Sequence, residues 1–102
     1  MLAELVMGHA VADFALQSEA MAKGKNWRTP YAIPWPYWLT AHALIHGAAV
    51  TVVTGSVTLG LCETAAHWLI DLGKCSNKYG IHIDQALHLA CKVAWWMAVR
   101  YV

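Results

Sequence analysis

The sequence predicts an all-α protein, an antiparallel four-helix bundle that is embedded in a membrane. Apolar residues recur at helical spacing in stretches that prolines, glycines and polar turns separate, and no stretch sustains the alternation of a β-strand. The chain has 102 residues, 59% of them hydrophobic and only 13% charged. Residues 1–102 are expected to form one domain, which either buries most of itself in a compact helical core or lies in a bilayer.

The first helix is expected over residues 2–22, where apolar and polar residues recur three and four positions apart. Residues 23–36 contain three prolines and Gly24 and are expected to form a loop. A second helix is expected over residues 36–54. It begins at Pro36, a residue that is favoured in the first turn of a helix.

The short turn over residues 54–56 separates the second helix from a third, which is expected over residues 57–73. The polar residues 74–80 follow, and a fourth helix is expected over residues 82–101. Short connections give an up-down-up-down topology. The two longer loops therefore lie at one end of the bundle and the short turn lies at the other.

Each predicted helix carries two metal-competent side chains four residues apart, a spacing that places both on one helix face. The pairs are His9/Asp13, His42/His46, His67/Asp71 and Asp84/His88. In a chain with only six histidines, four such pairs indicate a shared site rather than chance. The topology places all of them in the same half of the bundle, so they are expected to converge as metal ligands.

Imidazole and carboxylate ligands suit Zn²⁺, Mn²⁺ or Fe²⁺, and the absence of paired thiolates argues against a structural zinc site. Four ligands suffice for one tetrahedral zinc, so the eight candidates allow one or two divalent ions, with two the natural interpretation. Two-metal sites typically activate water and stabilise a developing oxyanion, as in phosphoester hydrolysis. Asp13, Asp71 and Asp84 are the candidate catalytic residues because each can bridge two metals.

Further polar residues lie beside the ligand pairs. Gln17 and Gln85 are candidates to orient the ligands through hydrogen bonds, with ordinary polar helix residues as the alternative. Glu63 and Lys92 each continue a ligand-bearing helix face by four residues and are expected to neutralise each other.

Arg28 and Lys74 lie in the loops at the site end and are the candidate substrate-binding residues, because a cation can meet a phosphate. Their alternative role is that of loop cations at a membrane interface. His82 breaks the pairing and is expected to be a helix-start residue. For the cluster as a whole, the alternative is a structural polar network, in which every buried group must be paired.

Five of the seven Lys and Arg residues lie in the two loops at the site end, which matches the positive-inside bias. The expected location is the inner (cytoplasmic) membrane of a bacterial cell, with the site facing the cytoplasm. No segment offers the ~20 uninterrupted apolar residues of a typical span. The interruptions, however, are mostly the proposed ligands, and ionisable groups inside membrane spans are usually functional. A compact soluble or peripheral bundle is the alternative.

The net charge of +1, without a basic run, argues against nucleic acid as a partner. The chain contains no nucleophile-elbow motif and no phosphate-binding loop. The remaining partners to consider are the membrane, a small-molecule or lipid phosphate as substrate, and further copies of the chain in a homo-oligomer.

Four motifs in order resemble the uncharacterised-domain family numbered 3307, and the resemblance covers nearly the whole chain. They are His9-x3-Asp13-x3-Gln17, His42-x3-His46-Gly47, His67-x3-Asp71-x2-Lys74 and Asp84-Gln85-x2-His88. That family comprises small, mostly helical, predicted membrane proteins of bacteria and their phages, and the short chain is similar to its phage-borne members. The chain is more distantly similar to inner-membrane proteins labelled metal-dependent hydrolases.

The resulting hypothesis is a metal-dependent hydrolase of the membrane that acts on a phosphoester, such as a lipid-linked or nucleotide phosphate. Two alternatives stay open. One is a non-enzymatic, metal-stabilised membrane or phage accessory protein that acts by partner binding. The other is metal or proton transport along the histidine-lined interior.

Overall fold

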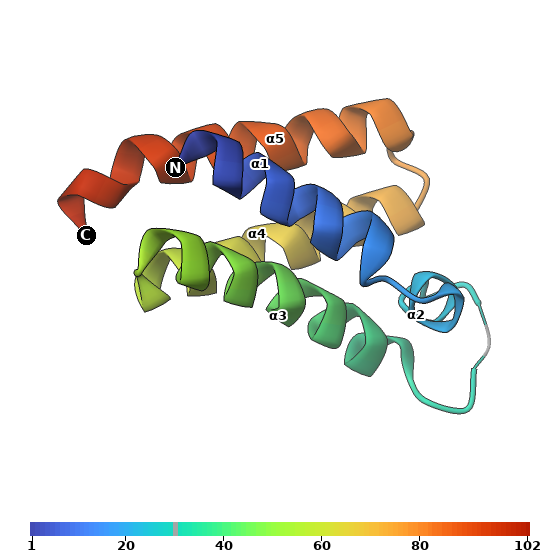
Figure 1. Cartoon of the computed structure of the whole chain (residues 1–102). Helices are drawn as coiled ribbons and strands as arrows, with labels where there is room; N and C mark the ends of the chain where they lie inside the picture. The colour runs from blue at the N-terminus through green and yellow to red at the C-terminus, as the bar shows by residue number, and fades with distance from the viewer. Residues whose placement is uncertain (30) are drawn as a thin grey trace.

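The structure, a computed structural model, describes residues 1–29 and 31–102. These residues form five α-helices and no strand, so the prediction of an all-α protein is confirmed. The helices are α1 (Leu2–Ala10), α2 (Glu19–Gly24), α3 (Trp35–Thr54), α4 (Val57–Cys75) and α5 (Ile81–Ala98), and a 3-10 turn over Val99–Tyr101 extends α5 (Figure 1).

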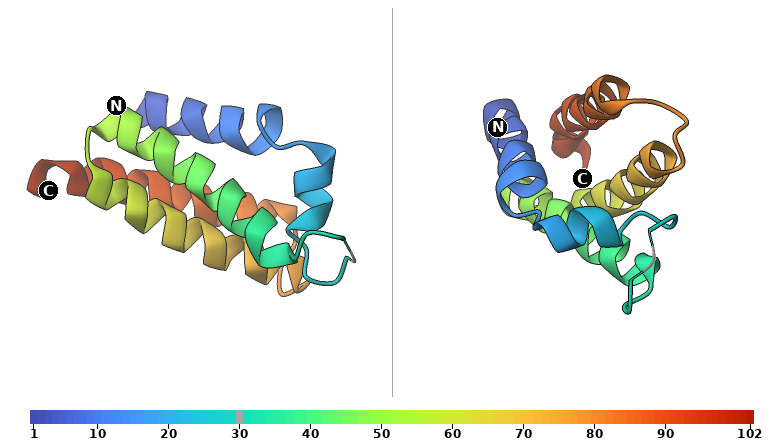
Figure 2. Two further views of the ribbon diagram at one scale, coloured as in Figure 1. Left: turned by 90° about the horizontal axis from the view of Figure 1, so that it is seen from below. Right: turned by 90° about the vertical axis from the view of Figure 1, so that its right-hand side faces the viewer.

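The four longer helices lie side by side along an elongated molecule of 42 × 23 × 21 Å (Figure 2). Helix α3 packs along α4, α4 packs against α5, and α1 packs against both α3 and α5. The short helix α2 packs against α3 at the end of the molecule where α3 begins. The faces of four helices therefore meet along one interior.

The helix expected over residues 2–22 is interrupted. Helix α1 gives way to a π-helical segment, Val11–Ala15, in which the amide of Leu16 donates to the carbonyl of Val11 at 2.9 Å. Ser18 then caps α2, and its hydroxyl accepts from the amide of Met21 at 3.1 Å. A serine side chain that satisfies a free backbone amide favours a new helix start over continuation of the old one. Helix α2 consequently includes the first residues of the expected loop.

Helices α3 and α4 approach closely because a glycine of each helix faces a threonine of the other. Threonine hydroxyls bond within their own helices, from Thr51 to the carbonyl of Gly47 and from Thr64 to that of Gly60, both at 2.9 Å. A β-carbon on Gly47 would overlap the hydroxyl of Thr64, and one on Gly60 would overlap that of Thr51. The contact is thus reciprocal, and it brings the histidines of α3 against those of α4.

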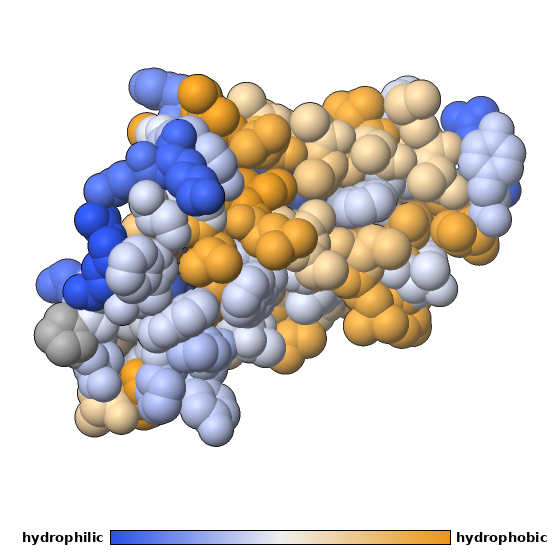
Figure 3. Space-filling view, turned by 180° about the vertical axis from the view of Figure 1, so that it is seen from behind, coloured by the Kyte–Doolittle hydropathy of each residue, from blue (hydrophilic) through white to orange (hydrophobic). Residues whose placement is uncertain are grey.

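The distribution of side chains is inverted relative to an ordinary globular domain, because ionisable groups fill much of the interior. Large apolar residues such as Phe14, Leu44, Val52 and Leu69 are exposed instead. Figure 3 shows hydrophobic residues over the middle of one face and hydrophilic ones gathered at the end that carries α2. In the part of the chain that the structure describes, no helix combines the length and the apolar character needed to cross a membrane.

Candidate metal centre

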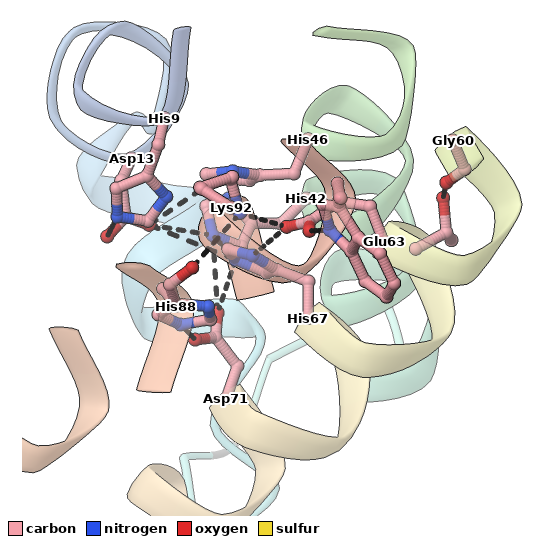
Figure 4. Close-up of polar contacts among 12 residues, drawn as sticks. His9, Asp13, His42, His46, Gly60, Glu63, His67, Asp71, His88 and Lys92 are labelled. Carbon is pink, nitrogen blue, oxygen red and sulfur yellow. Dashed lines mark hydrogen bonds and ion pairs between the residues drawn. The ribbon is translucent and has the colours of Figure 1, made fainter. Parts of the chain in front are cut away.

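The structure brings the side chains of the four ligand pairs together in the half of the molecule next to α2, and all of them are buried. Helix α1 with its π-helical extension supplies one pair, and α3, α4 and α5 supply one each. Figure 4 shows the labelled histidine and aspartate side chains directed toward one another from these separate segments, while the labelled Gly60 lies apart from them. The buried residues are His9, Asp13, His42, His46, His67, Asp71, Asp84 and His88.

A first group of potential ligands consists of Asp13, His42, His46 and His67, whose ligand atoms all lie within 4.8 Å of one another. Oδ1 of Asp13 is 3.2 Å from Nε2 of His42 and 3.4 Å from Nε2 of His46. Nε2 of His42 and Nε2 of His67 are 3.1 Å apart. Three imidazoles and one carboxylate match in number and type the ligands that a tetrahedral divalent ion takes.

A second group consists of Asp71, Asp84 and His88. Nε2 of His88 lies 3.1 Å from Oδ1 of Asp71 and 3.4 Å from Oδ1 of Asp84. Oδ2 of Asp71 faces the first group, at 3.2 Å from Nε2 of His42 and 3.5 Å from Nε2 of His67. Asp71 therefore lies between the two groups, with one oxygen toward each.

His9 lies at the edge of this arrangement and belongs to neither group. Its Nε2 is 2.9 Å from Oε1 of Gln85 and 3.8 Å from Oδ2 of Asp13. The amide nitrogen of Gln85 donates to Oδ2 of Asp13 at 2.7 Å and to Oδ2 of Asp84 at 3.2 Å. Gln85 thus connects three candidate ligands. Gln17 instead donates to the backbone carbonyl of Asp13 and does not bond its carboxylate.

Glu63 forms a buried network behind His67. Oε1 of Glu63 lies 3.3 Å from Nδ1 of His67 and accepts from the ammonium of Lys92 at 2.6 Å. The indole N–H of Trp95 donates to Oε2 at 2.5 Å. A carboxylate that accepts from Nδ1 fixes the ring and leaves Nε2 for a metal. Trp95 is not among the residues predicted from the sequence to belong to the site, although it lies three residues from Lys92 and hence on the same helix face.

Several buried polar atoms of the cluster have no hydrogen-bond partner among the described residues. These unpaired atoms include both ring nitrogens of His46, Nδ1 of His42 and Oδ1 of Asp84. Buried polar atoms are normally paired, and each exception calls for an explanation such as an ion. A purely structural polar network would have left fewer of these atoms unpaired.

The structure does not bring the two candidate substrate-binding residues to the cluster. Arg28 donates from Nε to the carbonyl of Cys75 at 3.1 Å, and Lys74 lies in the last turn of α4, partly exposed. The cation of the expected loop that reaches the cluster is Lys25, whose Nζ lies 2.8 Å from Oδ2 of Asp71. No spacing in the sequence distinguishes Lys25 from other loop cations. His82 is exposed and lies outside both groups.

The family model described as "Protein of unknown function (DUF3307)" matches residues 1–102 of the chain. No curated protein and no solved structure matches it. The match covers every residue of the buried cluster.

Proposed function

The chain belongs to the DUF3307 family of proteins of unknown function, and from its buried site we propose that it is a metal-dependent hydrolase acting on a phosphoester. One observation carries this proposal. Asp13, His42, His46 and His67 place ligand atoms within 4.8 Å of one another in the interior, while neither ring nitrogen of His46 has a hydrogen-bond partner among the described residues. Such an arrangement is suited to hold a cation.

The donor set fits one or two divalent transition-metal ions, Zn²⁺, Mn²⁺ or Fe²⁺. The first group would hold one ion and the second group the other, and Asp71 has an oxygen directed to each group. When bound, such ions supply Lewis-acid activation of water and of a phosphoryl oxygen at neutral pH. The protein's own part is to orient the ligands, through Glu63 on His67 and through Gln85 on Asp13.

We further propose that the protein is an antiparallel four-helix bundle in the inner membrane of a bacterial cell, with the α2 end toward the cytoplasm. The exposed apolar side chains and the ionisable interior support this location. So does the close packing of α3 on α4 through glycine and threonine, which is common between helices in lipid. Lys23, Arg28 and Lys78 are exposed at the α2 end, beside Trp27 and other aromatic residues.

The first test is elemental analysis of the protein purified in detergent. We expect one or two equivalents of a transition metal in the wild-type protein and a clear loss in His88→Gln. His82→Gln is the matched control, because this histidine lies near the start of the same helix but is exposed. Equal metal content in both variants would contradict the proposed centre, as would a wild-type protein that binds no metal.

The second test is turnover of a generic substrate, p-nitrophenyl phosphate, by the metal-loaded protein. Asp71→Asn keeps the shape of the side chain but removes the charge between the two ligand groups, and it should abolish turnover. His82→Gln should retain full activity. Activity that survives in Asp71→Asn would show that the hydrolysis does not depend on this site.

A second candidate function is a non-enzymatic, metal-stabilised protein that acts by partner binding, and the closure of the cluster favours it. Among the described residues, the crevice that borders His9, His46 and Lys92 has no room for a water molecule. A substrate could therefore reach the ligands through this crevice only if the helices that line it, α1, α3 and α5, moved apart. If chelation lowers thermal stability while no phosphoester is consumed, this second candidate is preferred.

A further inference from the structure

Lys25 is a buried cation to which the proposed metal ligation gives no role. Its side chain is only 6% exposed, although the residue directly follows the short helix α2. Its Nζ lies 2.8 Å from Oδ2 of Asp71, the carboxylate between the two ligand groups. Lys23, two residues earlier, pairs instead with Glu19 at the surface.

Contacts on both sides of Lys25 fix the direction of its side chain. Gly24 packs so closely on the indole ring of Trp38 that a β-carbon there would overlap the ring. Beyond Lys25, the side chains of Trp27 and Arg28 donate hydrogen bonds of 2.9 Å and 3.1 Å to the C-terminal end of α4. The segment is thus anchored to α3 and to α4, and the ammonium group is held at the site.

The buried charges around Lys25 do not balance. Four carboxylates and two ammonium groups are buried at the site: Asp13, Glu63, Asp71, Asp84, Lys25 and Lys92. With ionised carboxylates and neutral histidines, two positive charges against four negative ones give a net charge of −2. One divalent ion cancels this charge, whereas two leave a net charge of +2. Because an uncompensated buried charge is costly, a two-metal centre favours an anion beside it.

Lys25 has donors to offer to such an anion. An ammonium group carries three N–H donors, and the hydrogen bond to Asp71 uses one of them. A divalent ion on Asp71 would also compete with the ammonium for that carboxylate, which leaves Lys25 free to bind a second acceptor. Phosphate oxygens are acceptors that lysine commonly binds as a point charge.

We propose that Lys25 is the anion-binding residue of the site and holds a phosphoryl oxygen of the substrate beside Asp71. This inference rests on the proposed function and narrows its substrate class to a phosphate monoester. A monoester dianion supplies the two negative charges that a two-metal centre would need. The phosphoryl group belongs either to a lipid or to a soluble compound, and both present the same chemistry to Lys25.

The test uses the full chain in detergent, loaded with Mn²⁺, with its metal content measured first. Inorganic phosphate and a short-chain phosphatidate are titrated in separate experiments, and binding is measured by calorimetry. The compound that the wild-type protein binds shows whether the phosphoryl group comes from a soluble compound or from a lipid. Lys25→Met removes the charge while keeping an unbranched side chain that is only one atom shorter. We expect phosphate to bind at least about tenfold more weakly, the effect of one lost charge-assisted hydrogen bond. Lys23→Met, the matched surface control, should bind as the wild-type protein does.

Equal phosphate affinity of Lys25→Met and the wild-type protein would overturn the inference, as would a Mn²⁺-loaded wild-type protein that binds neither compound. Lys25→Arg keeps the cation and should keep the affinity within a few fold. A loss in Lys25→Arg as large as that in Lys25→Met would also overturn the inference. Failure of the proposed function gives a different result, a wild-type protein that binds no metal in the first step.

Discussion

The half of the molecule next to α2 and the opposite half are held together by different interactions. Next to α2, the interior contains imidazoles, carboxylates and the ammonium group of Lys25, with a few apolar residues such as Leu39 and Cys75 among them. At the opposite end, Leu5, Val50 and Leu59 form a small apolar core against partly buried neighbours such as Trp95. The comparison indicates that burial of apolar side chains stabilises the apolar half, whereas the polar half depends on charge compensation.

The largest effect is expected at the boundary between the two halves, where Glu63 pairs with Lys92. In metal-free protein, Glu63→Leu should lower the free energy of unfolding by about 3–5 kcal/mol, because it leaves the Lys92 ammonium buried and unpaired. The double variant Glu63→Leu with Lys92→Met should recover most of this loss. Denaturant titration in detergent measures both.

Glu19→Leu is the control for that comparison, because it removes the exposed partner of Lys23 on α2 and should change stability little. A loss for Glu19→Leu as large as that for Glu63→Leu would show that burial of the pair is not what matters.

In the apolar half, Leu59→Ala should lower the free energy of unfolding by about 2–5 kcal/mol, the range for a large-to-small change in a core. Metal content per folded molecule should not change, because the nearest ligand on α4, His67, lies two turns further along the helix. Leu61→Ala, on the exposed face of the same helix, should change neither the free energy of unfolding nor the metal content. Loss of metal from folded Leu59→Ala would contradict the separation of the two halves.

Chelation should act on the polar half alone. When the free metal concentration is about 100 times the dissociation constant, metal binding raises the free energy of unfolding by about 2.7 kcal/mol. A chelator should remove that gain. Acid should have the same effect, because protons compete with the metal for the imidazole and carboxylate ligands. Thermal melts with and without chelator measure the difference. A variant that has lost its metal ligands, His42→Ala with His67→Ala, should be insensitive to chelator.

The smallest effect is expected at the contact that joins both halves along α3 and α4. Gly60→Ala should lower stability by about 1–3 kcal/mol, because its β-carbon overlaps the hydroxyl of Thr51. Gly8→Ala on α1 meets only Ala49 at 3.8 Å, an ordinary contact, and should be neutral or stabilising. Equal melting temperatures for the two variants would contradict the close approach of α3 and α4.

The sequence predicted the helical class and the meeting of the ligand pairs, because both follow from spacing along a helix. The sequence did not predict the features that depend on tertiary contacts. Gln17 continues the four-residue spacing of His9 and Asp13, which suggests one unbroken helix, yet the π-helical segment and the Ser18 cap end it first. In the sequence Lys25 is indistinguishable from the other loop cations, because its direction is set by contacts with other helices that no local pattern records.

The reciprocal packing of Gly47 on Thr64 and of Gly60 on Thr51 also has an evolutionary consequence. A β-carbon at Gly47 would also lie 2.6 Å from the carbonyl oxygen of Gly60, and one at Gly60 would lie 2.7 Å from that of Gly47, so a smaller threonine alone cannot make room for it. Across the family, positions 47 and 60 should therefore stay glycine wherever the two helices are this close. Larger residues at these positions in related sequences would mean that the two helices of the hairpin are further apart in those proteins.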